Sequence, residues 1–321
     1  MTEFGFANAW SKGLRILAGR GVAHAIFLIG LGVALPLALQ YLLLGAAVSM
    51  LAPVSGAAGY PSAGNDELAL AVLGVGFVFQ LGSYFASWRI GLGPAAGIGR
   101  AAGFGLLAGL VATGGVAVLV AAGAALAQVS PGFGALAVMI AFLVMFALFQ
   151  AVVAALIAVA LALMLVLAIV FGASTGQIGL AATLVGGSGF AVVLLLILAA
   201  AFLWLTARSS CAVAVMAARP TFNPFAAIAE SWRLTWEEQW RIMGYLAVIG
   251  LVLALLGLAA AVATGAAVNA ALSGDAAPDF PLDPALFSAL ASIPLAYLSV
   301  LVPAGIYREL VGTGAPVDVF A

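Results

Sequence analysis

Long apolar runs separated by short polar junctions make up most of this chain. They cover residues 22–51, 68–88, 104–127, 135–171, 189–218, 242–272 and 285–307. A helix of about 20 apolar residues crosses the hydrocarbon core of a membrane, which is about 30 Å thick. Only 7% of the residues are charged, whereas soluble domains have about 25%. The sequence therefore predicts an all-α polytopic helical membrane protein, with six to eight transmembrane helices in hairpins, as one integral membrane domain over residues 1–321.

The ten basic residues all lie at the junctions on one side of this series of runs. Loops that remain in the cytoplasm are enriched in Lys and Arg. The other polar segments, 52–67 and 273–284, carry acids and turn-favouring residues. We expect a multi-pass protein of the bacterial inner membrane, with cytoplasmic N- and C-termini and these two segments outside. The basic residues are Lys12, Arg15, Arg20, Arg89, Arg100, Arg208, Arg219, Arg233, Arg241 and Arg308.

The junction before run 242–272 has the pattern of an amphipathic helix. Asn223 and Pro224 favour a helix start, because Asn accepts a hydrogen bond from a free N–H and Pro fits the first turn. We expect a short helix in the membrane plane, a turn near 234–235, and a capping box of Thr235 and Glu238 that starts a new helix at Trp236. Tryptophans beside charges suit an interface; the alternative is a soluble cap whose stripe packs on other helices. The apolar stripe comprises Phe225, Ile228, Ala229, Trp232, Trp236, Trp240 and Met243.

The first junction repeats this design more weakly, with Phe6, Trp10, Leu14 and Leu17 on one face. We call such a short in-plane helix, with the turn that leads into the next membrane helix, an elbow. The Gly-rich segment 90–100 is compatible with another elbow. An elbow and the helical hairpin that follows it together define pseudo-repeat units of about 4–88, 89–218 and 220–310. We expect the elbows to be cytoplasmic. The predicted interfacial anchors are Trp10, Trp88, Trp232, Trp236 and Trp240.

The number of crossings depends on residues 135–188. Run 135–171 would form a helix of about 55 Å, against a core of about 30 Å. If the second and third basic junctions are both cytoplasmic, an even number of crossings must lie between them. Either 135–171 makes two short crossings that turn near Gln150, or it is one long helix and 172–188 re-enters the membrane. The first alternative is preferred, although no Gly or Pro marks a turn at Gln150.

The composition argues against several classes of function. A net charge of −1 gives no reason to expect nucleic-acid binding. The single cysteine, Cys211, allows no internal disulfide and lies in an apolar setting typical of an inert thiol. His24 has no Cys, Asp or Glu at ligand spacing, so we expect no metal site and no cofactor. The apolar runs lack acid, base and metal-binding candidates, so we expect no enzymatic activity.

Small residues recur four positions apart within the runs, at Gly30 and Ala34, Gly105 and Gly109, and Gly250 and Ala254. This spacing allows close helix packing in membranes. In a chain with 39 glycines it also arises by chance.

The stretch 208–246 contains an Arg late in an apolar run, the small-residue segment Ala212–Ala218 and the sequence Ser231-Trp232-Arg233-Leu234-Thr235. In these features it resembles the glycerophosphoryl diester phosphodiesterase membrane-domain-like family of bacterial inner-membrane proteins. The resemblance implies a helical membrane domain with in-plane elbows and usually six crossings. It transfers no phosphodiesterase activity, which belongs to a separate soluble domain.

Arg208 is the most informative single position. If the helix continues to residue 218, Arg208 lies in the bilayer, where a cation costs at least about 2.5–3.5 kcal/mol. If the helix ends at 208, the side chain is an ordinary anchor that reaches the interface. We expect a protein that handles or organises lipid or another amphiphile, with membrane lipids as partners. The alternative is a scaffold or subunit with a membrane-protein partner or a second copy. The candidate lipid or anion contacts are Arg208, Arg219, Arg233 and Arg241.

Overall fold

The computed structural model describes residues 4–44, 66–93, 97–129, 151–160, 162–163, 189–219, 223–272 and 284–312. Within these ranges every regular element is a helix, which confirms the predicted all-α class. The elements are α1 (Phe6–Gly19), α2 (Gly21–Ala25), the π-helix η1 (Ile26–Ala34), α3 (Leu35–Leu44), α5 (Asp66–Leu92), α6 (Ile98–Val129), a short helix Ala151–Ala160, α10 (Gly189–Ser209), α11 (Ala212–Ala218), α12 (Pro224–Thr235), α13 (Gln239–Leu272) and α14 (Pro284–Val311).

Five stretches of helix among the described residues are long and apolar enough to cross a membrane, so this is a multi-pass membrane protein. They are Gly21–Leu43, Ala71–Leu92, Ile98–Val118, Leu196–Ala218 and Gln239–Leu256. The alternatives for 135–188 fall outside the described residues, apart from the helix Ala151–Ala160 and residues 162–163. Most of the two predicted outer segments, 52–65 and 273–283, also falls outside them.

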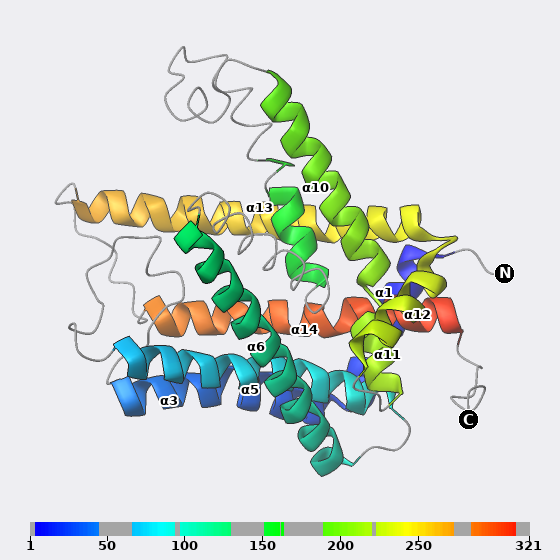
Figure 1. Cartoon of the computed structure of the whole chain (residues 1–321), viewed down its shortest axis with the longest axis horizontal. Coiled ribbons are helices and arrows are strands. Elements are labelled where there is room, and N and C mark those ends of the chain that lie inside the picture. Colours follow the sequence, from blue (N-terminus) through cyan, green and yellow to red (C-terminus); the bar gives the residue numbers. More distant parts are fainter. Residues whose placement is uncertain are drawn as a thin grey trace.

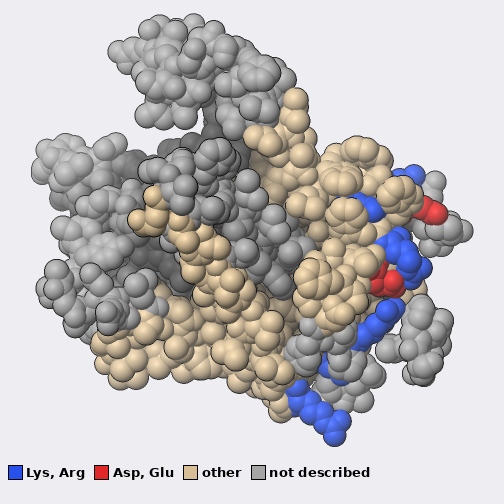
Figure 2. Space-filling model, in the orientation of Figure 1, with Lys and Arg blue, Asp and Glu red and all other residues tan. Residues whose placement is uncertain are grey.

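The axes of the long helices α3, α5, α13 and α14 are roughly aligned, and α6 and α10 cross them obliquely (Figure 1). The amphipathic helix α1, the short helices α11 and α12 and the C-terminal end of α14 gather at one end of the molecule. Lys and Arg side chains concentrate at this same end, together with the acidic side chains visible in that view (Figure 2). The fold thus brings basic junctions that are far apart in sequence to one end, which we call the basic end.

Close contacts between small residues join the helices. A Cβ atom on Gly109 of α6 would lie 2.5 Å from the Val78 carbonyl oxygen of α5, and one on Gly105 would meet the Gly82 carbonyl oxygen. On α13, a Cβ atom on Gly250 would lie 2.7 Å from the Ala155 carbonyl oxygen. Two of the predicted small-residue pairs, Gly105 with Gly109 and Gly250 with Ala254, therefore lie at helix contacts. The third pair, Gly30 with Ala34, does not, because nothing lies within 4 Å of a Cβ atom on Gly30.

The first and last helices pack together in the same way. A Cβ atom on Gly13 of α1 would lie 2.6 Å from the Leu301 carbonyl oxygen of α14, and one on Gly305 would meet the Ala9 carbonyl oxygen. Lys12 also forms an ion pair with Glu309 at 2.5 Å. The N-terminal elbow is therefore fixed to the C-terminal helix by both shape and charge.

Trp88 corrects one of the predicted interfacial anchors. Its side chain is buried, and its Nε1 donates a hydrogen bond of 3.1 Å to the Val300 carbonyl oxygen of α14. A tryptophan at the end of an apolar run has the sequence pattern of an anchor. Here α14 lies over it and supplies the polar partner that an indole N–H needs when buried.

We expect the substitution Gly109→Ala to destabilise the protein, because the new methyl group would overlap the backbone of α5. Overpacking of this kind costs about 1–3 kcal/mol. The matched control is Gly103→Ala on the same helix, where nothing lies within 4 Å of the added Cβ. Thermal unfolding in detergent should show a lower midpoint for Gly109→Ala and an equal or higher one for Gly103→Ala. Equal midpoints for the two variants would contradict the described α5–α6 contact.

Candidate functional site

The predicted elbow before α13 exists, and its start is as expected. The Asn223 Oδ1 atom accepts a hydrogen bond of 3.1 Å from the Ala226 N–H, and Pro224 occupies the first turn of α12. The end differs from the prediction, because α13 begins at Gln239 and not at Trp236. The Thr235 hydroxyl does not cap α13. It donates to the Ser231 carbonyl oxygen at 2.8 Å and lies 3.4 Å from the Arg208 carbonyl oxygen.

The face of α12 that packs on the protein is its small-residue face. Ala227, Ser231 and Thr235 are buried. Most of the aromatic stripe is exposed instead, with Phe225 at 80% and both Trp236 and Trp240 at 64%. The interfacial position of these side chains remains a prediction, and an exposed apolar stripe agrees with it.

The predicted apolar run 189–218 is present and contains the candidate span Leu196–Ala218, but its helix divides into α10 and α11 at Ser210 and Cys211. Ser231 of α12 occupies the break. Its hydroxyl donates to the Arg208 carbonyl oxygen at 2.7 Å and accepts from the Cys211 N–H at 3.2 Å. The helix neither ends at Arg208 nor runs on unbroken, because a side chain from α12 replaces the backbone partners lost at the break.

Beyond the break, α11 is buried along its whole length. Its C-terminal carbonyl groups need partners, and Arg89 of α5 supplies them. The Arg89 Nη1 atom lies 2.7 Å from the Ala217 carbonyl oxygen and 3.3 Å from that of Ala218. A cation at this position also offsets the negative end of the helix dipole. Arg89 is thus a structural residue.

Arg208 is the least satisfied charged residue of this region. Its side chain is only 2% exposed, and its Cζ atom lies 4.9 Å from the ring centroid of Trp232 and 4.8 Å from that of Trp236. Two indole rings stabilise a cation by about 0.5–2 kcal/mol each. The buried Nε and Nη1 atoms of Arg208, and the Nε1 atom of Trp232, have no hydrogen-bond partner among the described residues. Each unsatisfied donor costs about 1–3 kcal/mol, and more where it is charged.

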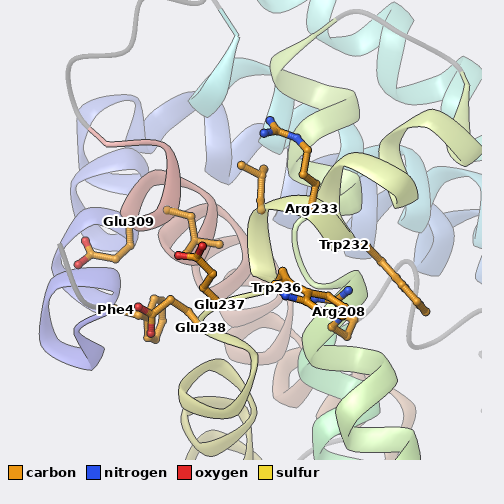
Figure 3. A pocket seen from close by; sticks show the side chains of 10 residues that line it. Phe4, Arg208, Trp232, Arg233, Trp236, Glu237, Glu238 and Glu309 are labelled. Atoms are coloured by element: carbon orange, nitrogen blue, oxygen red, sulfur yellow. The ribbon is translucent and has the colours of Figure 1, made fainter. Parts of the chain in front are cut away.

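Arg208 and Trp232 line a pocket of about 660 Å³. Arg208 and the two tryptophans lie on one side of it, and the carboxylates of Glu237, Glu238 and Glu309 lie on the other (Figure 3). The described residues that line it are Phe4, Arg208, Trp232, Arg233, Leu234, Trp236, Glu237, Glu238, Glu309 and Leu310. Its volume is within the range of about 300–1,000 Å³ that is usual for small-ligand sites.

The other predicted lipid-contacting arginines have carboxylate partners. Arg219 and Arg233 both pair with Glu230, at 3.2 Å and 2.7 Å. Arg241 pairs with Glu238 at 3.3 Å. Of the four candidates, only Arg208 and Arg233 line the pocket. The structure therefore distinguishes Arg208, which has no carboxylate partner among the described residues, from the other three.

Several residues of this region have no sequence signal that predicts their role. Ser231 and Thr235 stand out only as parts of motifs, and no local pattern places Phe4, Glu237 or Glu309 at a pocket. Phe4 and Glu309 reach the pocket because α1 packs on α14. Neither local sequence predicts this contact. Trp10 is 37% exposed on α1, at the basic end.

Two further titratable side chains, those of His24 and Cys211, are not among the residues that line this pocket. His24 is buried with its Nδ1 atom 2.5 Å from the Ser87 Oγ atom, and Cys211 is buried beside Ser231. In the described part of the chain, no three His, Cys, Asp or Glu side chains gather where they could hold a metal ion.

Comparison of the chain with protein-family models, with curated proteins and with solved structures finds no significant match in any of the three. The resemblance of residues 208–246 to a membrane-domain family therefore stays a prediction, as do the three pseudo-repeat units.

A pH dependence follows from the ion pairs of the elbow. The Arg233 guanidinium, hydrogen-bonded to both oxygens of Glu230, holds the pKa of that carboxyl group below its ordinary value. A carboxylate with a lowered pKa stabilises the folded state above its unfolded pKa of about 4.3, and this contribution is lost as the pH falls through the folded value. Because the arginines are partly exposed, we expect less than about 1 kcal/mol.

Thermal unfolding of the wild type and of Glu230→Gln between pH 6 and pH 3 tests this. The wild type should be the more stable protein at pH 6, and the difference should shrink as the pH falls below about 4.3. A difference that stays constant over this interval would contradict the assigned pairing.

Proposed function

We propose that this protein binds the phosphate-bearing head group of a membrane phospholipid at the Arg208 pocket, as a non-enzymatic lipid-handling or membrane-organising protein. The observation that carries the proposal is a guanidinium group only 2% exposed, beside a pocket, with donors that the described residues leave unsatisfied. A phosphate group accepts several charge-assisted hydrogen bonds and matches the planar geometry of Arg.

The location of the pocket supports a lipid over a soluble anion. The pocket is lined by residues of α12 and of the C-terminal end of α14, which lie at the basic end, and by the exposed side chain of Trp236. Trp240, in the first turn of α13, is also exposed. Exposed indoles with adjacent cations are typical of the head-group region of a membrane. A lipid whose chains lie along the helix surface would place its phosphate at this depth.

The alternative function, a scaffold or a subunit of a larger membrane complex, would use the apolar flanks of the helices. Exposed side chains such as Val248, Leu251 and Leu255 on α13 provide such a flank. The same side chains are equally suited to contact lipid chains, whereas an unsatisfied buried Arg beside a pocket has no comparable explanation. We therefore favour the lipid-binding function.

Substitution of Arg208 by Gln should reduce the phospholipid that remains bound after purification in mild detergent by about tenfold or more, the effect of losing one charged hydrogen-bonding group. Trp232→Phe keeps the aromatic ring and removes only the N–H donor, so we expect a smaller loss. Arg15→Gln, an exposed site at the same end of the molecule, should bind as the wild type does.

Native mass spectrometry of the three variants measures the bound lipid. Unfolding midpoints identify any variant that has failed to fold. Wild-type retention in a folded Arg208→Gln protein, or equal losses in Arg15→Gln, would contradict the proposal.

We further propose that the basic end faces the cytoplasm in a bacterial inner membrane, because Lys and Arg concentrate there and translocated segments are poor in them. Single cysteines placed at Arg15 and at Asp279, in a Cys211→Ser background, test this with a membrane-impermeant thiol reagent on intact cells. We expect labelling at residue 279 and none at residue 15. The reverse pattern would overturn the assigned orientation.

A further inference from the structure

We propose that the Arg208 pocket selects a zwitterionic phosphoethanolamine head group, in which a phosphate diester is linked to a primary ammonium group. This inference rests on the proposed function and names the class of lipid that the pocket takes. It is carried by the arrangement of the lining charges, which differ in sign on the two sides of the pocket.

The donor side of the pocket is suited to the phosphate. The buried Nε and Nη1 atoms of Arg208 and the Nε1 atom of Trp232 are unsatisfied N–H groups, and Trp232 packs against the Arg208 guanidinium. Two kinds of donor on neighbouring side chains can serve different oxygens of one phosphate. The ring contacts also hold the guanidinium in place before a ligand arrives, so little side-chain freedom is lost on binding.

The opposite side of the pocket is unsuited to a purely anionic ligand. Glu237, Glu238 and Glu309 all line it. Glu238 pairs with Arg241, and Glu309 pairs with Lys12. Glu237 is exposed and forms no ion pair with the described residues. A ligand with a phosphate alone would place negative charge beside these carboxylates, whereas a ligand that also carries an ammonium group would pair with Glu237.

The carboxylates favour a primary ammonium over a quaternary one. A primary ammonium has three N–H donors and can bond directly to carboxylate oxygens. A quaternary ammonium has none and is bound mainly by aromatic faces. The two indole rings that line this pocket, Trp232 and Trp236, are both packed against the Arg208 guanidinium. The free polar group on the far side is a carboxylate, so we expect ethanolamine to be preferred over choline.

The test uses the full-length protein in nanodiscs that hold equal amounts of phosphatidylethanolamine, phosphatidylcholine and phosphatidylglycerol with identical acyl chains. Native mass spectrometry measures the lipid that remains bound after release into detergent. For the wild type we expect a preference of about tenfold for the ethanolamine lipid, the effect of one charge-assisted hydrogen bond. Glu237→Gln should abolish the preference while total lipid binding continues.

The controls separate this inference from the proposed function. Asp66→Asn changes the first residue of α5, and none of the described lining residues belongs to α5, so this variant should keep the wild-type preference. Arg208→Gln should lose all three lipids. Arg208-dependent binding without a head-group preference would overturn the inference and leave the proposed function standing. Binding that does not depend on Arg208 would overturn both.

A last arm distinguishes a membrane lipid from a soluble ligand with the same chemistry. The deacylated, water-soluble form of the ethanolamine lipid is added in increasing excess over the bound lipid. We expect displacement only at a large excess, because the acyl chains contribute apolar burial that the soluble form lacks. Displacement at equimolar concentration would overturn the assignment of the site to a lipid head group.

Discussion

The hydroxyl group of Ser231 joins the elbow helix α12 to the point where the membrane helix α10 ends. It bonds the Arg208 carbonyl oxygen near the end of α10 and the Cys211 N–H group at the break. The arrangement of the basic end depends on this contact. It orients α12 so that Trp232 and Trp236 flank Arg208, and it turns the chain so that α11 enters the interior. A single polar side chain thereby links the break in a membrane helix to the environment of its buried cation.

The cost of burying that cation explains why the surroundings have this composition. A guanidinium is weakly hydrated for a cation and tolerates contact with aromatic faces. Two indole rings replace part of its hydration, but they accept no hydrogen bonds from the guanidinium edge. That edge remains unsatisfied beside a pocket, while every neighbouring arginine of the elbow has a carboxylate. The arginines of the elbow are paired with carboxylates, whereas Arg208 lines the pocket without a carboxylate partner among the described residues.

The helices could be predicted from the sequence because their signals are local. Apolar length identifies the membrane helices, and Asn223 with Pro224 identifies the start of α12. The buried face of α12 could not be predicted in this way. In a membrane protein an aromatic stripe can face lipid as readily as protein, and here the small residues Ala227, Ser231 and Thr235 face inward. The break at Ser210 and Cys211 depends on a side chain 20 residues later in the chain, and the burial of Trp88 depends on a carbonyl group 212 residues away. Such partners are absent from any local pattern.

The contact between α1 and α14 has a consequence for biosynthesis. Lys12 and Arg308, which meet across it, are separated by 296 positions. At about 5–20 residues per second, the ribosome needs roughly 15–60 s to travel that far. Throughout this interval the first elbow has no α14 to receive Ala9 and Gly13. Because this helix is amphipathic, it can remain at the membrane surface during that time. The contact between α1 and α14 forms only after the last helix has been inserted.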